Sequence, residues 1–145
     1  VIDCHIVFLG HESPKFLMLK RNENKIYGGT WQCVTGKIEE NEKPIDTAIR
    51  EVYEETGLKT INKWTIDQVN HFYESEQDRM NLIPIFGVEV KTLNVNLSNE
   101  HIDYKWCDIS EAERLFTWTQ QKNGLLEFNE MLTSQPEKLL FSKIS

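Results

Sequence analysis

Three glutamates at helical spacing are the residues in this sequence best suited to chemistry. Glu51, Glu54 and Glu55 stand at positions i, i+3 and i+4, so a helix would place their carboxylates side by side. Carboxylates that close repel one another, and Arg50 is the only basic residue within the predicted helix. We expect Arg50 to pair with Glu54 and a divalent cation to supply the missing positive charge. Oxygen ligands of this kind favour Mg²⁺, or Mn²⁺, over zinc.

The helix that carries these acids has predictable ends and one apolar side. Pro44 suits the first helical turn, where its missing N–H has no intrahelical partner. Gly57 suits the left-handed residue that ends many helices. The apolar side, which should pack on a sheet, comprises Ile45, Ile49, Val52 and Thr56. The alternative is a solvated acidic face with no function, but the agreement of caps, apolar side and acid spacing favours a metal site.

Composition indicates an ordinary globular protein. The chain has 145 residues, of which 39% are hydrophobic and 27% charged, enough for a single domain over residues 1–145 with a core that needs no disulfides. Cys4, Cys33 and Cys107 are widely separated and odd in number, which predicts reduced thiols and a cytoplasmic location. No apolar run approaches the length of a membrane span.

The net charge of −7 restricts the partners that the chain can bind. Residues 36–58 contain seven acidic and three basic side chains, so a nucleic-acid polymer would be repelled. A small phosphate ester would also be repelled unless metal ions bridged it to the acids. The charge balance therefore predicts a metal-dependent site for a small phosphorylated molecule.

Periodicity and turn residues predict the other elements. Strands are expected over residues 4–9, 15–20, 31–35, 59–73 (one or two strands around Asp67 and Gln68), 82–90 and 104–107. Ser110 and Glu113 resemble a capping box that opens a short helix to residue 116, and a longer helix should follow over residues 118–133. Leu139, Leu140 and Phe141 of the tail should dock on the body.

At residues 36–58 the sequence resembles the Nudix hydrolases. The family's box is matched at every spacing by Gly36, Glu42, Arg50, Glu51, Val52, Glu54, Glu55, Gly57 and Leu58. The resemblance implies an α+β protein with the Nudix fold, an α/β/α sandwich around a mixed β-sheet. It also implies Mg²⁺-dependent attack of water on a diphosphate that is linked to another group, often a nucleoside.

The resemblance suggests roles for individual residues. Glu51, Glu54 and Glu55 would be metal ligands, Arg50 would orient them, and Glu51 and Glu54 would take part in catalysis. The backbone carbonyl of Thr35 would complete the ligand set, although the commonest family pattern has Pro-Gly where this chain has Val34-Thr35. A further acid must accept the proton of the attacking water. Many family members have a Glu six residues before an aromatic residue, and this spacing points to Glu100, ahead of Trp106, as general base and further ligand.

Substrate contacts are less clearly encoded. Charge makes four residues candidates for phosphate binding: Lys20, Arg21, Lys37 and Arg79. Four aromatic residues could stack on a flat ring: Trp31, Trp64, Phe72 and Tyr73. Each of these residues has an ordinary surface or core role as its alternative. His101 could shuttle a proton, with a structural role as its alternative.

Three short stretches narrow the resemblance. Residues 17–21, 31–36 and 100–106 look like the bacterial dihydroneopterin triphosphate and dATP pyrophosphohydrolases. This subgroup releases pyrophosphate from a nucleoside or pterin triphosphate, which is the activity that we expect, from a monomer or a homodimer. Two alternatives remain open: a dinucleoside polyphosphate hydrolase that acts on diadenosine tetraphosphate, and a non-catalytic domain that senses a nucleotide.

Overall fold

The computed structural model describes residues 1–145 and contains seven strands and four helices. The strands are β1 (Ile2–Phe8), β2 (Lys15–Arg21), β3 (Trp31–Gln32), β4 (Val34–Gly36), β5 (Asn62–Glu74), β6 (Arg79–Val90) and β7 (His101–Cys107). The helices are α1 (Pro44–Thr56), α2 (Ile109–Leu115), α3 (Thr119–Ser134) and α4 (Pro136–Ser142). No helix combines the length and the apolar character that crossing a membrane requires.

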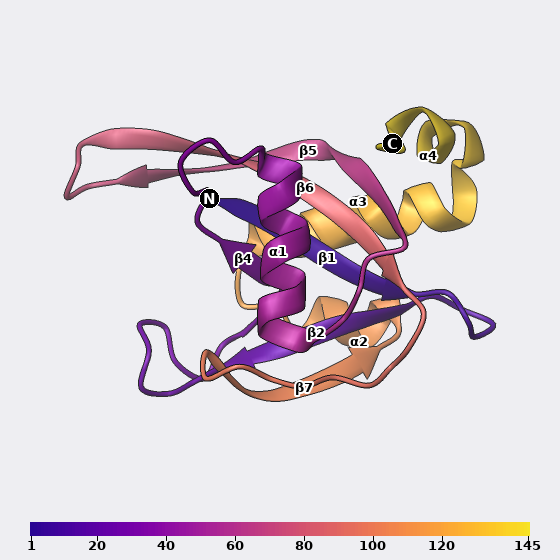
Figure 1. Cartoon of the computed structure of the whole chain (residues 1–145), viewed down its shortest axis with the longest axis horizontal. Coiled ribbons are helices and arrows are strands. Elements are labelled where there is room, and N and C mark those ends of the chain that lie inside the picture. Colours follow the sequence, from indigo (N-terminus) through magenta and orange to yellow (C-terminus); the bar gives the residue numbers. More distant parts are fainter.

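The strands form one mixed sheet with the order β3-β2-β1-β6-β5. Strand β1 runs parallel to β6 and antiparallel to β2, while β4 pairs with β1 and β7 pairs with β2. Helix α1 crosses one face of this sheet, and α3 lies behind the other face (Figure 1). The expected α+β sandwich around a mixed sheet is therefore confirmed.

Two hydrophobic cores fill the spaces between the three layers. Alternate residues of β1 point to opposite faces, as the pleat of a strand requires. Ile2, Cys4 and Ile6 pack with Ala48 and Val52 of α1. Val7, on the other face, belongs to the core that includes Leu125, Phe128 and Met131 of α3. Trp64 also lies in this second core, so it is buried rather than available for stacking.

Helix α1 begins and ends where the sequence indicates. Pro44 occupies the first turn, and Gly57 adopts a left-handed conformation with φ of 75°, which glycine tolerates because it has no Cβ. The side of α1 that is buried differs from the expected apolar side. Ile45 and Ile49 are only partly buried, whereas Thr47 and Ala48 are fully buried together with Val52 and Thr56, so the contact face is rotated toward smaller side chains.

Several other elements differ from the expectations. Residues 62–74 form one strand whose register shifts between Thr65 and Val69, so the polar pair inside it marks an irregularity and not a turn. The N-cap of α2 is Asp108, whose carboxylate accepts a hydrogen bond from the backbone N–H of Glu111 at 2.9 Å. The Ser110 capping box was therefore wrong, because an ionised acceptor two residues earlier caps the helix.

The tail forms helix α4, and only part of it docks. Leu139 packs against the core beside α3. Leu140 and Phe141 are 70% and 82% exposed, which contradicts their expected docking. A helix places successive side chains on different faces, so one leucine of this apolar run turns inward and the next two residues turn outward.

We predict that Gly87 of β6 is required by the Phe128 ring, because a Cβ at this position would overlap the ring atoms. Gly87→Ala should lower the free energy of unfolding by about 1–3 kcal/mol, as overpacking does. Denaturant unfolding measures this loss. In a Phe128→Leu background the same alanine should cost less, and strictly additive losses would contradict the contact.

Candidate metal and substrate site

Arg50 connects three acids of the candidate site through hydrogen bonds. Its Nε and Nη2 donate to the two carboxylate oxygens of Glu42 at 2.8 and 3.0 Å. Its Nη1 donates to Glu51 at 2.9 Å and to Glu54 at 3.2 Å, and Nη2 also reaches the backbone carbonyl of Lys37 at 3.1 Å. The expected pair of Arg50 with Glu54 is present, but the bidentate contact of Arg50 with Glu42 is shorter and involves two hydrogen bonds. The guanidinium lowers the pKa of Glu42 to about 2.

Glu51 lies over a glycine that makes room for it. Its side chain is 15% exposed, and a Cβ on Gly36 would overlap its Cγ and Cδ atoms. Burial raises the pKa of Glu51, while Arg50 opposes that rise. Strand β4 therefore brings the first residue of the box against the acids of α1, 15 positions later in the sequence.

Glu55 is the buried member of the acid group. Its carboxylate, Glu100 and His101 place one ligand atom each within 4.8 Å of one another, although Glu100 and His101 belong to a distant part of the sequence. Burial first, and then the proximity of Glu100, raises the pKa of Glu55 to about 10. Its Oε2 has no hydrogen-bond partner, which is an unusual state for a buried carboxylate oxygen.

A glutamine fixes the histidine of this cluster. The amide Nε2 of Gln32 lies 3.0 Å from Nε2 of His101, and because an amide nitrogen only donates, Nε2 of His101 must accept. The ring proton then sits on Nδ1, which faces Oε2 of Glu55 at 4.0 Å. Burial lowers the pKa of His101 to about 4, so the ring is neutral at pH 7. Nothing in the sequence distinguished Gln32 as part of the site.

The arrangement fits a divalent cation. The side chains of Glu51, Glu55 and Glu100 offer hard oxygen ligands, and Glu51 is close enough to Glu100 for the two charges to interact. The unpaired oxygen of Glu55 is a ligand atom that lacks a partner within the protein. Neutralising several close carboxylates with Mg²⁺ or Mn²⁺ would remove their repulsion, and their oxygen chemistry suits these ions. Glu54 is more exposed and lies at the margin of the group.

A cavity of about 670 Å³ adjoins this acid group. Its volume is within the range of small-molecule sites. Gln32 and Thr35 line it, and Gln32 in turn contacts His101, so Gln32 connects the cavity to the cluster of Glu55, Glu100 and His101. Its remaining lining includes Asp3, Asn70 and Gln121, which sequence reasoning missed because they come from β1, β5 and α3.

The structure separates the proposed substrate contacts into two groups. Arg21 and Phe72 line the cavity. Lys20, Trp31 and Lys37 do not line it, and Trp31 packs against the core beside α3.

The other two candidates lie on the β5–β6 hairpin. Arg79 starts β6, where it pairs with Glu74 at 3.2 Å, and Tyr73 donates a hydrogen bond to Asp78 at 2.6 Å. Neither lines the cavity. Their partners within the hairpin explain both side chains without a substrate.

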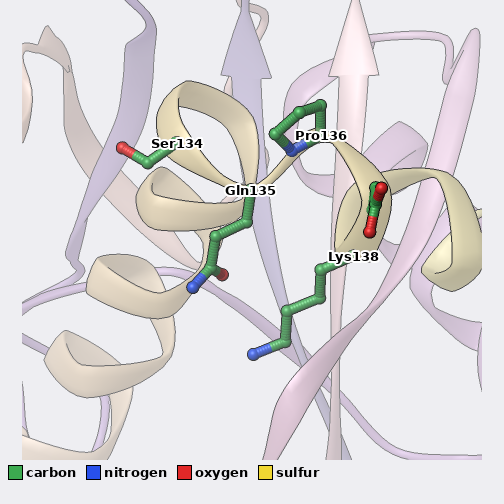
Figure 2. Close-up of a pocket in the computed structure, with 5 residues that line it drawn as sticks. Ser134, Gln135, Pro136 and Lys138 are labelled. Atoms are coloured by element: carbon green, nitrogen blue, oxygen red, sulfur yellow. The ribbon is translucent and has the colours of Figure 1, made fainter.

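A second hollow lies at the corner between α3 and α4. It is lined by Ser134, Gln135, Pro136, Glu137 and Lys138 (Figure 2). The ammonium group of Lys138 is already paired with Asp67 at 2.8 Å and Glu127 at 2.6 Å. This hollow therefore presents no free positive charge to a phosphorylated ligand.

Comparison with known proteins places these features in a family. The family model described as NUDIX domain matches residues 3–128. A bis(5′-nucleosyl)-tetraphosphatase of Mus musculus is 31% identical over 144 residues, which covers 90% of this chain and 94% of the mouse protein. A dihydroneopterin triphosphate diphosphatase of Haemophilus influenzae is 30% identical over 119 residues, or 74% of this chain and 73% of that one.

Solved structures support the same fold. A NUDIX hydrolase of Listeria monocytogenes superposes with a TM-score of 0.76 at 24% identity. The match covers 90% of this chain and 92% of the other chain. At that identity the likeness concerns the fold alone.

We predict that Gly36→Ala weakens metal binding without unfolding the protein. The added methyl group must push the Glu51 side chain away, and misplaced support of this kind typically costs 10- to 100-fold in metal affinity. Calorimetric titration with Mn²⁺ measures the change, and circular dichroism checks the fold. Glu40→Ala, which removes an exposed acid from the loop between β4 and α1, should leave the affinity for Mn²⁺ unaltered. Wild-type affinity in folded Gly36→Ala protein would contradict the role of Glu51.

Proposed function

This chain belongs to the Nudix family of hydrolases, which act on phosphoanhydride bonds, and from that premise we propose its reaction. We propose that it is a Mg²⁺-dependent pyrophosphohydrolase of nucleoside or pterin triphosphates, with dATP among the candidate substrates. The products would be a monophosphate and pyrophosphate. The observation that carries this proposal is that Gln32 lines a cavity large enough for a nucleoside or pterin and also contacts His101, which lies beside Glu55 and Glu100.

The proposed roles follow from position and charge. Glu51, Glu54, Glu55 and Glu100, with the carbonyl of Thr35, would hold the ion. Bound Mg²⁺ supplies positive charge to the phosphate oxygens and lowers the pKa of a coordinated water. Arg50 keeps Glu42, Glu51 and Glu54 in a fixed arrangement through its hydrogen bonds.

Two side chains, those of Glu100 and Arg21, would act on the substrate directly. Glu100 is exposed beside the buried Glu55, so its carboxylate is free to accept the proton of the attacking water. Arg21 lines the cavity, and its guanidinium would bind phosphate oxygens. The Nε of Arg21 is held by the backbone carbonyl of Ile26 at 2.7 Å, which fixes the side chain while the terminal nitrogens remain available.

Cellular location belongs to the same proposal. All three cysteines are free and buried. Burial raises the pKa of the Cys107 thiol to about 12, which keeps it protonated and unreactive. Unpaired thiols of this kind suit the reducing cytoplasm.

A dinucleoside polyphosphate hydrolase is the second candidate. It is favoured by the 31% identity to the mouse tetraphosphatase across most of both chains. Its substrate, diadenosine tetraphosphate, would yield ATP and AMP, whereas a triphosphate would yield a monophosphate and pyrophosphate. Product analysis by chromatography after incubation with each substrate and Mg²⁺ therefore separates the two candidates.

We predict that Glu55→Gln lowers the rate of hydrolysis by a few orders of magnitude, because it removes one charged ligand of the ion. Initial rates with dATP, dGTP, dihydroneopterin triphosphate and diadenosine tetraphosphate measure this effect. Glu130→Gln makes the same charge change at an exposed position of α3 and should retain the wild-type rate. Nucleotide binding without turnover in the wild type would instead support a sensing domain, and equal rates in the wild type and Glu55→Gln would exclude the proposed site.

A further inference from the structure

Asp3 is a buried carboxylate at the wall of the cavity. It is 4% exposed, lines the cavity from β1, and its hydrogen-bond partners are two neutral amides. Nδ2 of Asn70 donates to Oδ2 at 2.7 Å, and Nε2 of Gln121 lies 3.5 Å from Oδ1. Burying a carboxylate whose side-chain hydrogen-bond donors are all neutral is costly. A ligand that donates to it would explain its place.

A chain of amides fixes which atoms face Asp3. Oδ1 of Asn70 accepts from Nε2 of Gln68 at 2.8 Å, and the same Gln68 nitrogen donates to the backbone carbonyl of Gln120 at 3.0 Å. If the Asn70 amide were flipped, its Nδ2 would face the donor Nε2 of Gln68, and its Oδ1 would face the carboxylate of Asp3. The flipped orientation is therefore excluded. The amide nitrogen of Asn70 faces the carboxylate and donates one of its two N–H groups to Oδ2 of Asp3.

Gln121 leaves an acceptor unpaired at the same wall. Because a carboxylate only accepts, the amide nitrogen of Gln121 must face Asp3. Its Oε1 is then buried without any hydrogen-bond partner, a state that costs free energy unless a ligand N–H pairs with it. Asp3 and Gln121, which contact each other and both line the cavity, thus each keep acceptor capacity that no protein donor uses.

Adjacent acceptors select a particular heterocyclic edge. Guanine and pterins share a 2-amino-4-oxopyrimidine edge, on which an amino group and a ring N–H donate next to each other. The amino groups of adenine and cytosine stand beside a ring nitrogen that is an acceptor. This nitrogen would meet an acceptor oxygen of Asp3 or Gln121, and no hydrogen bond could form there. Uracil and thymine offer a single N–H between two carbonyls. Only the first edge satisfies both acceptors.

The same cavity has flat apolar surfaces for such a ring. Tyr27, Phe72 and Trp118 line it, and all three are among the exposed large hydrophobic residues of the chain. The rings of Tyr27 and Trp118 meet edge to face, with centroids 5.2 Å apart. Aromatic faces that are not covered by the core are available for stacking on a heterocycle.

We propose that Asp3 and Gln121 are specificity-determining residues that accept hydrogen bonds from the 2-amino-4-oxopyrimidine edge of the substrate. This inference rests on the proposed triphosphate hydrolysis, whose substrate class it narrows to guanine nucleotides or pterin triphosphates. The aromatic side chains would hold the ring, while Arg21 and the acid group would act on the phosphates.

The sharpest test compares dGTP with dITP, which lacks only the 2-amino group. The ratio of their kcat/KM values in the wild type should be at least about 5, because a well-placed polar pair discriminates by 1–3 kcal/mol, or roughly 5- to 150-fold. Gln121→Met, which removes the free acceptor, should lower the ratio to within about twofold. Asp3→Asn should lower it as well. Gln77→Met changes an exposed amide in the β5–β6 turn and should preserve the ratio.

Further measurements distinguish a failure of this inference from a failure of the proposed activity. Dihydroneopterin triphosphate, compared with dGTP, identifies whether a pterin or a guanine is the better source of the edge, and either result supports the inference. Calorimetric binding of dGMP against dIMP gives the same discrimination without turnover. If hydrolysis occurs but dITP or dATP equals dGTP, or if folded Gln121→Met and Asp3→Asn keep the wild-type ratio, the inference is overturned while the activity stands.

Discussion

The guanidinium group of Arg50 and the carboxylates around it impose the main constraint on this structure. Four acids compete for one positive group, since Glu39 approaches Arg50 at 3.7 Å in addition to Glu42, Glu51 and Glu54. Glu55 has no share in it and is buried beside Glu100. The protein thus pairs the outer acids with Arg50, whereas the inner acids, Glu55 and Glu100, form no ion pair with a lysine or arginine and Arg21 is only a nearby charge. This uneven distribution is what makes the inner acids a place for a cation.

The fold keeps the inner acids together against their repulsion. Strand β4 pairs with β1 through the register of Thr35 with Asp3, which fixes Gly36 under Glu51. Strand β7 pairs with β2 and places His101 opposite Arg21. The Gln32–His101 hydrogen bond then joins the end of β3 to the start of β7. These restraints come from strand pairing and from a hydrogen bond between strands, so the position of the acids depends on tertiary pairing as well as on the helix.

The sequence predicted what depends on local spacing and missed what depends on pairing between distant strands. The limits of α1 and the neighbourhood of its acids follow from helical periodicity and terminal residues, which act within a few positions. Asp3, Gln32, Asn70 and Gln121 come from four elements, and no local pattern marks them as neighbours. Local rules also failed where two acceptors compete, because Asp108 rather than Ser110 caps α2.

Burial of aromatic and apolar side chains was the other unpredictable feature. Trp64 and Phe72 lie on the same strand, yet one belongs to the core and the other lines the cavity. The register shift between Thr65 and Val69 separates them, and an irregular strand has no fixed alternation to read. Leu139 and Phe141 differ for a related reason, since the rotation of α4 on the body decides which residue turns inward.

The most direct test of the account is an anomalous difference map from crystals soaked in Mn²⁺. The account predicts a peak about 2 Å from carboxylate oxygens of Glu55 and Glu100, with Glu51 close by. A map without a peak there, in which Oε2 of Glu55 instead accepts a hydrogen bond from a protein donor, would contradict it.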